Sequence, residues 1–173
     1  MSLENTRTQK NLMTAFFRES GAAIEYNFYA NQAKKDGYEQ IANTFNDFAS
    51  NEKAHASVWF KLYHGISNTR DNLINSAQLE NYERSVLYSE FAKTAREEGF
   101  EDIAFLFEEV AKIEHEHEKT YKKLVDCITK NCFYTSEKEI TYKCLNCGNQ
   151  IKAKDAPEKC PVCAHPQSYF IKQ

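Results

Sequence analysis

Glycine and proline are scarce in this chain. Its 173 residues include five Gly and three Pro, and two of the prolines, Pro161 and Pro166, fall near the C-terminal end. Because these residues interrupt helices and mark tight turns, their scarcity favours long helices over a protein built from strands and turns. The length suits one domain, or one domain with a small module attached.

Long apolar runs and an excess of basic charge are also missing. No run approaches the ~18 apolar residues of a membrane-spanning helix, and the first ten residues lack the apolar core of a secretory signal. The formal net charge of −3 lacks the basic excess typical of proteins that bind nucleic acid. We therefore expect a cytoplasmic protein that contacts neither membranes nor nucleic acid.

Helical periodicity runs through about the first 130 residues. It breaks at Gly37, at Gly65 and at Gly99, which predicts four helices over roughly residues 5–35, 38–64, 71–98 and 100–130. The second half repeats the first: Gly37 and its neighbours are echoed 62 residues later around Gly99. A repeated helical hairpin predicts an all-α, four-helix bundle built from two hairpins, over residues 1–132.

A different composition begins near Phe133, where the helical period stops. We expect a separate β/loop module over residues 133–173, too small to bury a sufficient core unless a metal holds it together. This module carries two Cys-x-x-Cys pairs separated by twelve residues: Cys144, Cys147, Cys160 and Cys163. Their spacing predicts a tetrahedral four-thiolate site and, taken alone, suits iron and zinc equally.

Two further cysteines, Cys127 and Cys132, lie near the end of the fourth predicted helix. In a cytoplasmic chain, cysteines indicate metal ligation before disulfides. These two have no complementary pair, so we expect free, reduced thiols.

Each hairpin also carries a Glu-x-x-His motif, Glu52 with His55 and Glu114 with His117. Residues three apart share one face of a helix, so each pair can present a carboxylate and an imidazole to one point. A single such motif occurs by chance on many solvated helices. Two motifs at the same distance past the hairpin turns favour a metal site.

Further glutamates lie at matching depth on the first and third helices. At ~1.5 Å rise per residue, Glu19 is level with the first motif, and Glu80 and Glu83 with the second. Five glutamates and two histidines can thus converge in mid-bundle. Buried carboxylates repel one another unless cations neutralise them, and these hard donors suit two iron or manganese ions.

Two tyrosines follow these glutamates along their helices. Tyr26 lies seven residues past Glu19, and Tyr88 five past Glu83. Either hydroxyl could donate a hydrogen bond to a ligand carboxylate. The alternative, that they are ordinary core aromatics, stays open.

These motifs together resemble those of one family, the rubrerythrins. Residues 51–55, 79–83 and 114–118 resemble the family's second, third and fourth helix motifs, and the four-cysteine region resembles its rubredoxin-type tail. Residues 18–20 resemble the first helix motif, although Arg18 stands where the family commonly has Gly. The match covers nearly the whole chain and implies a ferritin-like bundle followed by a rubredoxin-like module.

The resemblance also implies roles for individual residues. Glu52 and Glu114 would bridge two irons, with Glu19 and Glu80 as terminal ligands. His117 would bind the second iron. The first iron would be held by Glu83 when oxidised and by His55 when reduced. With Tyr26 and Tyr88, these two exchanging ligands are the candidate catalytic residues.

A chemical function follows from the same resemblance. The four cysteines would hold one iron, for which zinc could substitute, and this iron would pass electrons to the di-iron site. Hydrogen peroxide would be reduced to water, which protects against oxidative stress. The electrons would come from an external donor, rubredoxin or an NAD(P)H-dependent reductase, because the chain has no Gly-rich nucleotide loop of its own.

Two rival functions are weaker. Iron oxidation or storage by a ferritin-like bundle leaves Glu83 and the four cysteines unexplained. The other is a non-enzymatic binding protein with a structural zinc ribbon, which colour would distinguish, because ferric thiolate is red and zinc is colourless.

The link between the hairpins bears on assembly. In a ferritin-like crossover the link would have to run back along the two helices that it joins, a distance of about 31 Å at ~1.5 Å per helical residue. Residues 65–70 reach at most ~20 Å. Residues 65–79 could be extended, the bundle could be a simple up-down one, or hairpins could be exchanged between subunits. Short connections favour exchange, so we expect a homodimer with exchanged hairpins.

Overall fold

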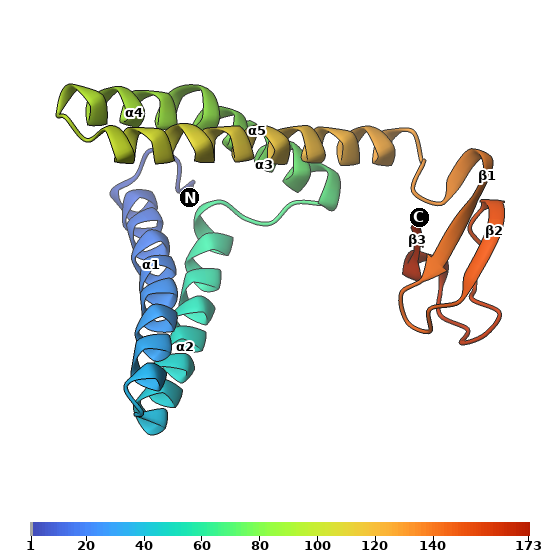
Figure 1. The fold of residues 1–173 in the computed structure, drawn as a ribbon, viewed down its shortest axis with the longest axis horizontal. Coiled ribbons are helices and arrows are strands. Elements are labelled where there is room, and N and C mark those ends of the chain that lie inside the picture. Colours follow the sequence, from blue (N-terminus) through green and yellow to red (C-terminus); the bar gives the residue numbers. More distant parts are fainter. Residues whose placement is uncertain (1) are drawn as a thin grey trace. The chain divides into compact units, whose positions relative to one another are not determined.

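The computed structural model describes residues 2–173 and divides into two compact units, one up to Ile66 and one from Ser67 (Figure 1). Each unit is described by itself. Within the described residues, no helix is long and apolar enough to cross a membrane.

The first unit is a hairpin of two antiparallel helices, α1 (Arg7–Lys35) and α2 (Glu39–Tyr63), which lie side by side in Figure 1. Helix α1 begins where the Thr6 side chain accepts a hydrogen bond from the Gln9 backbone N–H at 3.1 Å. It ends at a turn in which Gly37 has φ +83°, a left-handed conformation that costs glycine little. The sequence predictions for both helices are confirmed within a few residues.

The second unit begins with the other hairpin. Its first arm is one continuous helix made of α3 (Thr69–Tyr82), a π-helical segment η1 (Glu83–Leu87) and α4 (Tyr88–Glu97). Its second arm is α5 (Glu101–Thr129), against which all three segments pack. Four helical arms were predicted and are present, but the π-helical segment was not foreseen.

The repeat seen in the sequence is also present in the packing. Small alanines let the two arms of each hairpin approach closely, and one phenylalanine packs on each alanine cluster. Every member of one cluster has its counterpart 62 residues later in the other: Ala30, Ala33, Ala42 and Phe45 against Ala92, Ala95, Ala104 and Phe107. The two hairpins are therefore versions of one structural unit.

Large apolar side chains lie on the faces of the helices that the alanines leave free. Several are about half exposed or more, among them Phe17, Ile24 and Phe28 on α1 and Phe105 and Leu106 on α5. Contiguous exposed apolar surface of this kind is typical of surfaces that bind another protein surface.

The module at the C-terminal end is a small antiparallel sheet of order β2-β1-β3. Its strands are β1 (Thr135–Cys144), β2 (Gln150–Asp155) and β3 (Phe170–Lys172), the last preceded by a short 3-10 helix, η2 (Gln167–Tyr169). Its core is one buried cluster made of Tyr142, Cys144, Ala156, Cys160 and Phe170. Two of these five residues are predicted metal ligands, so this small core depends on its metal site.

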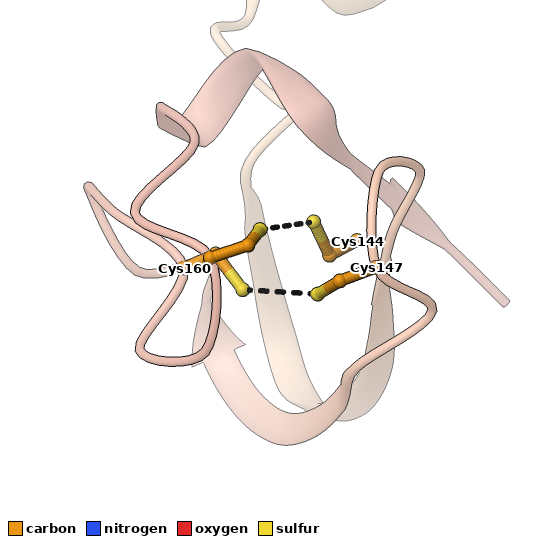
Figure 2. Close-up of side chains that lie close together, drawn as sticks. Cys144, Cys147 and Cys160 are labelled. Atoms are coloured by element: carbon orange, nitrogen blue, oxygen red, sulfur yellow. Dashed lines mark hydrogen bonds between the residues drawn. The ribbon is translucent and has the colours of Figure 1, made fainter.

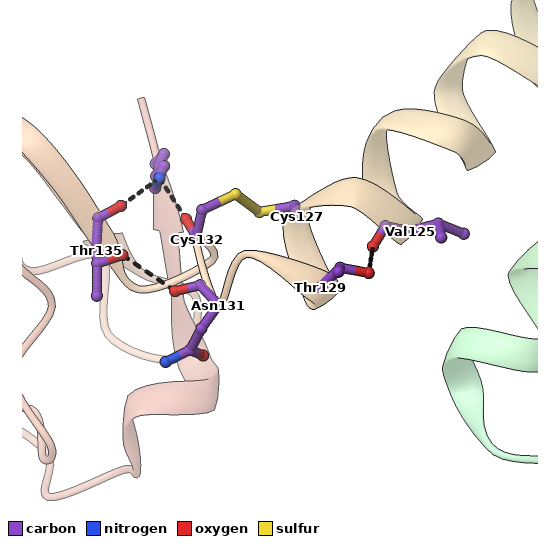
Figure 3. The surroundings of a disulfide bond; sticks show 7 residues. Val125, Cys127, Thr129, Asn131, Cys132 and Thr135 are labelled. Carbon is purple, nitrogen blue, oxygen red and sulfur yellow. Dashed lines mark hydrogen bonds between the residues drawn. A yellow bond between two sulfur atoms is a disulfide. The ribbon is translucent and has the colours of Figure 1, made fainter.

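One alternative for the link between the hairpins is wrong, and so is the expectation for Cys127 and Cys132. Helix α3 begins at Thr69, where the Asn68 side chain accepts from the Asp71 N–H at 3.0 Å, so residues 65–79 are not extended. Cys127 and Cys132 are not free thiols but form a disulfide (Figure 3). The domain boundary after residue 132 stays a prediction.

Candidate metal centres

The first hairpin brings together three of the predicted ligands. Glu19 of α1 and Glu52 and His55 of α2 each have a donor atom within 4.8 Å of the other two. The His55 Nδ1 lies 3.1 Å from a Glu52 carboxylate oxygen and 3.9 Å from one of Glu19. Two carboxylates and one imidazole thus converge from neighbouring helices.

The second hairpin holds a group of the same composition. Glu80 of α3 and Glu114 and His117 of α5 again have donor atoms within 4.8 Å of one another. The His117 Nδ1 lies 2.7 Å from Glu114 and 3.7 Å from Glu80. The repeated sequence motif therefore produces a repeated group of donors.

The carboxylates in both groups perturb one another. A hydrogen bond with Glu52, then burial and the charge of Glu52, raise the pKa of Glu19. The same hydrogen bond lowers the pKa of Glu52, helped by one from His55. In the second group, burial and the neighbouring Glu114 raise the pKa of Glu80. Each group holds more negative charge than its surroundings stabilise, which a cation would correct.

Glu83 lies beside the second group without joining it. Burial raises the pKa of its carboxyl first, and the charge of nearby Glu114 raises it further. It is also the first residue of the π-helical segment. Glu80 lies eight residues before Tyr88, whereas Glu19 lies seven before Tyr26. A π-helical turn absorbs such an extra residue, and these turns often occur at functional sites.

The two candidate tyrosines occupy equivalent places in the hairpins. The Tyr26 and Phe45 ring centroids lie 6.0 Å apart, as do those of Tyr88 and Phe107. Burial, followed by the charges of Glu83, Glu114 and Glu80, raises the pKa of the Tyr88 hydroxyl. Tyr88 therefore lies within the field of the second group and keeps its proton as a donor. Its hydrogen bond to a ligand stays a prediction, as does that of Tyr26.

Trp59 was missed from the sequence. It lies four residues after His55 on α2, hence on the same face one turn further along. Its indole nitrogen is buried and has no hydrogen-bond partner within residues 2–173. Glu52 is the main cause of the raised pKa of Glu19, and the nearby Trp59 N–H partly offsets this rise because it lowers the same pKa. The only tryptophan of the chain therefore borders the first group.

A buried ion pair beside the second group was also missed. The Glu118 side chain is 5% exposed and accepts a hydrogen bond from the Arg84 Nε at 3.2 Å. Lys122 contacts its other oxygen, and Arg84 also donates to Asn81 at 2.9 Å. Because Arg84 follows Glu83 directly, these contacts fix the π-helical segment against α5. This pair could not be predicted from sequence, because oppositely charged residues on two packed helices are very common.

The four cysteines of the module converge as predicted. Figure 2 shows the sulfurs of Cys144, Cys147 and Cys160 turned toward a common centre. The Cys144–Cys163 and Cys147–Cys160 sulfurs lie 3.7 and 3.6 Å apart. These separations are too long for disulfides, whose S–S bond is about 2.05 Å. A tetrahedral ion with bonds of about 2.3 Å places its ligand sulfurs about 3.8 Å apart, so the four thiols fit one metal ion.

Two similar loops hold these cysteines. In each, the residue after the second cysteine, Gly148 or Ala164, has positive φ, at +76° and +59°. Each donates its N–H to the carbonyl of the first cysteine, at 2.9 and 2.8 Å. The repeated turn presents two sulfurs from each loop to the same point.

The thiols are unequal in acidity. A backbone hydrogen bond from His165 lowers the pKa of Cys163, to about 6. A similar bond from Asn149 lowers that of Cys147, but burial and hydrogen bonds with the other three sulfurs outweigh it and raise the pKa to about 12. Four clustered thiols cannot all ionise without a cation, which a bound metal supplies.

These features define a class of protein: ferritin-like helical hairpins with carboxylate–histidine metal sites, joined to a four-thiolate module. The family model for rubrerythrin matches residues 10–125 and 71–152, and that for the rubrerythrin rubredoxin-like domain matches residues 142–171. Rubrerythrin of Porphyromonas gingivalis is 42% identical, covering 98% of this chain and 91% of that protein. Rubrerythrin of Nitratidesulfovibrio vulgaris is 40% identical, covering 98% and 95%. The chain belongs to the rubrerythrin family.

The family membership agrees with the donor groups found in the structure. Two Glu–Glu–His groups and one four-cysteine cluster fit the di-iron site and the single thiolate-bound iron of the family. The chain is accordingly an iron-dependent oxidoreductase of the peroxidase type. The role of each ligand within the di-iron site stays a proposal.

Trp59 provides a direct test of the first group. We expect Co2+ added to the metal-free protein to quench the tryptophan fluorescence, because the ion would bind within one helical turn of the indole. In His55→Ala the Co2+ affinity obtained from the quenching should fall at least about tenfold, as expected for loss of a ligand. Unchanged fluorescence while Co2+ demonstrably binds at carboxylate sites would contradict the assignment.

The thiol acidities predict proton release on metal binding. At pH 7.5 Cys163 is already a thiolate while Cys147 is protonated, so Zn2+ binding should release protons, but fewer than four per ion. A pH indicator in weak buffer measures them. Affinity should rise with pH, because fewer thiols must then ionise. Binding without proton release would exclude a four-thiolate site.

Proposed function

We propose that this chain reduces hydrogen peroxide to water at a di-iron site, with electrons delivered through the thiolate-bound iron. The reaction consumes two electrons and two protons for each peroxide and yields two waters. The observation that carries the proposal is Glu83, a half-buried carboxylate beside a Glu–Glu–His group that is already complete without it. A site for iron oxidation alone has no use for this additional donor or for a four-cysteine module.

The two Glu–Glu–His groups would together hold the two irons of the site. Glu52 and Glu114 would bridge the irons, and Glu19 and Glu80 would be terminal ligands. His117 would bind the second iron throughout. Glu83 and His55 would alternate as ligands of the first, Glu83 in the oxidised and His55 in the reduced state. When bound, the irons supply electrons and positive charge for cleavage of the O–O bond.

Protein groups would handle the protons. Burial keeps the Tyr88 hydroxyl protonated beside Glu83 and Glu114, so it can donate a hydrogen bond to an oxygen that gains negative charge. Tyr26 occupies the equivalent place in the first hairpin. Burial also raises the pKa of Glu83, so this carboxyl takes up a proton more readily than an exposed one when it leaves the iron.

The electrons would enter at the four-cysteine module. Cys144, Cys147, Cys160 and Cys163 would hold an iron that accepts one electron at a time. The donor would be rubredoxin or an NAD(P)H-dependent reductase. Zinc in this module would leave the hairpins intact but interrupt electron delivery, because zinc has no redox chemistry.

Replacement of Glu83 tests this function. In the fully reduced, iron-loaded protein mixed anaerobically with hydrogen peroxide, the red thiolate-iron absorbance should return rapidly and much faster than with oxygen. Glu83→Gln should bind iron normally but slow this return at least about tenfold, as expected for loss of a group that acts during turnover.

Glu90→Gln is the matched control, because Glu90 is exposed on the same arm and should leave the rate unchanged. A Glu83→Gln protein that turns over at the wild-type rate would reject the ligand exchange. An iron-loaded wild-type protein that reacts faster with oxygen than with peroxide would favour iron oxidation instead.

We also infer that the chain forms a homodimer with exchanged hairpins. The exposed apolar faces of the helices need a partner surface. The connection between α2 and α3 is only residues 64–68, which span at most ~18 Å. A connection this short favours pairing with a hairpin of a second copy. Light scattering at micromolar concentration should give the mass of a dimer, and a monomer would contradict the inference.

A further inference from the structure

Cys127 and Cys132 lie where α5 ends and the chain leads into β1 (Figure 3). Both are half-buried, and neither belongs to any metal-binding group within the described residues. Cys132 lines an open groove of about 660 Å3, together with Thr135, Lys138 and Lys172. Small molecules can therefore reach Cys132 from solvent.

The turn that holds the pair is closed without the disulfide. Backbone N–H groups of Lys130, Asn131 and Cys132 donate to the carbonyls of Asp126, Ile128 and Cys127, at 2.9, 3.1 and 2.9 Å. A cross-link over five residues restricts the unfolded chain far less than one over a long loop. The fold therefore does not depend on this disulfide, which can open and close in the folded protein.

The surroundings of the two sulfurs differ. The Lys172 ammonium donates to the backbone carbonyls of Cys132 and Thr135, at 2.5 and 2.7 Å. A positive charge therefore lies beside the backbone of Cys132, and positive charge near a cysteine favours its thiolate. Cys127 lies in the last turn of α5, where the helix dipole disfavours negative charge. Cys132, the one of the two that lines the groove, is therefore the expected attacking thiol.

We propose that Cys127 and Cys132 form a reversible dithiol/disulfide site that exchanges electrons with small thiols and disulfides. The Cys132 thiolate attacks one sulfur of a small disulfide and releases one thiolate, which leaves a mixed disulfide on Cys132. Cys127 loses its proton, attacks the Cys132 sulfur and releases the second thiolate. The cysteine pair gives up two electrons, the small disulfide becomes two thiols, and a thiol in excess reverses the sequence.

Equilibration of the full-length, iron-loaded protein with glutathione and glutathione disulfide tests the site. After acid quenching and alkylation, mass spectrometry gives the fraction of disulfide at each ratio. We expect both cysteines to change together in one two-electron transition while the red thiolate-iron absorbance stays constant. A pair that stays in one state at every ratio, or that changes only as the colour is lost, would overturn the proposal.

Single variants test the order of attack. In Cys127→Ser, Cys132 should accumulate a stable mixed disulfide with glutathione, and Cys132→Ser should form one at Cys127 at least tenfold more slowly. Lys172→Met in the Cys127→Ser background should slow the reaction of Cys132 severalfold. Circular dichroism and the thiolate-iron absorbance show that each variant is folded. Equal rates at the two cysteines would refute the roles assigned to them.

Discussion

The structure depends on the cost of gathering negative charge in one place. Two groups of glutamates and one group of four thiols each bring together donors that repel one another unless a cation lies among them. Hydrogen bonding with Glu52, then burial and the charge of Glu52, raise the pKa of Glu19, and burial followed by Glu114 raises that of Glu80. Burial and hydrogen bonds with the other three thiols likewise raise the pKa of Cys147. Bound metal therefore contributes to the stability of the folded chain as well as to its chemistry, most of all in the small module.

Both hairpins position their metal donors by the same sequence pattern. Alanines bring the helices of each hairpin together, and the Glu-x-x-His spacing then sets a carboxylate and an imidazole on one face of the second helix. The second hairpin differs by one additional residue, which the π-helical turn absorbs. That turn begins at Glu83 and is fixed by the pair of Arg84 and Glu118. The asymmetry between the hairpins thus lies at the residue proposed to distinguish peroxide reduction from iron oxidation.

Much of this could be predicted from sequence, because the features obey fixed periods. The helices, the paired Glu-x-x-His groups and the four-cysteine cluster follow from spacing. The structure groups three predicted donors in each hairpin and the four cysteines in the module, whereas convergence of all seven carboxylate and imidazole donors at one site stays a prediction. The π-helical turn could not be predicted by a method that assumes regular helical rise. The Trp59 environment and the Arg84–Glu118 pair arise from packing between helices, which single-sequence patterns do not specify.

The cysteine pair was predicted wrongly for a different reason. Neither the expected compartment nor the lack of a second Cys-x-x-Cys pair decides whether two sulfurs meet; local geometry does. A turn with Asn131 at φ +51° brings the Cys127 and Cys132 Cα atoms to 4.9 Å. Cysteines five residues apart across a helix end are therefore a signal in their own right.

The protein is proposed to hold, for each chain, one coupled pair of irons and a separate thiolate-bound iron. Mössbauer spectroscopy of protein reconstituted with 57Fe and fully oxidised tests this directly. We predict that two thirds of the iron absorption belongs to a spin-coupled, carboxylate-bound ferric pair, and one third to a tetrahedral ferric thiolate. A spectrum with thiolate iron alone, or with uncoupled ferric ions in place of the pair, would contradict the account.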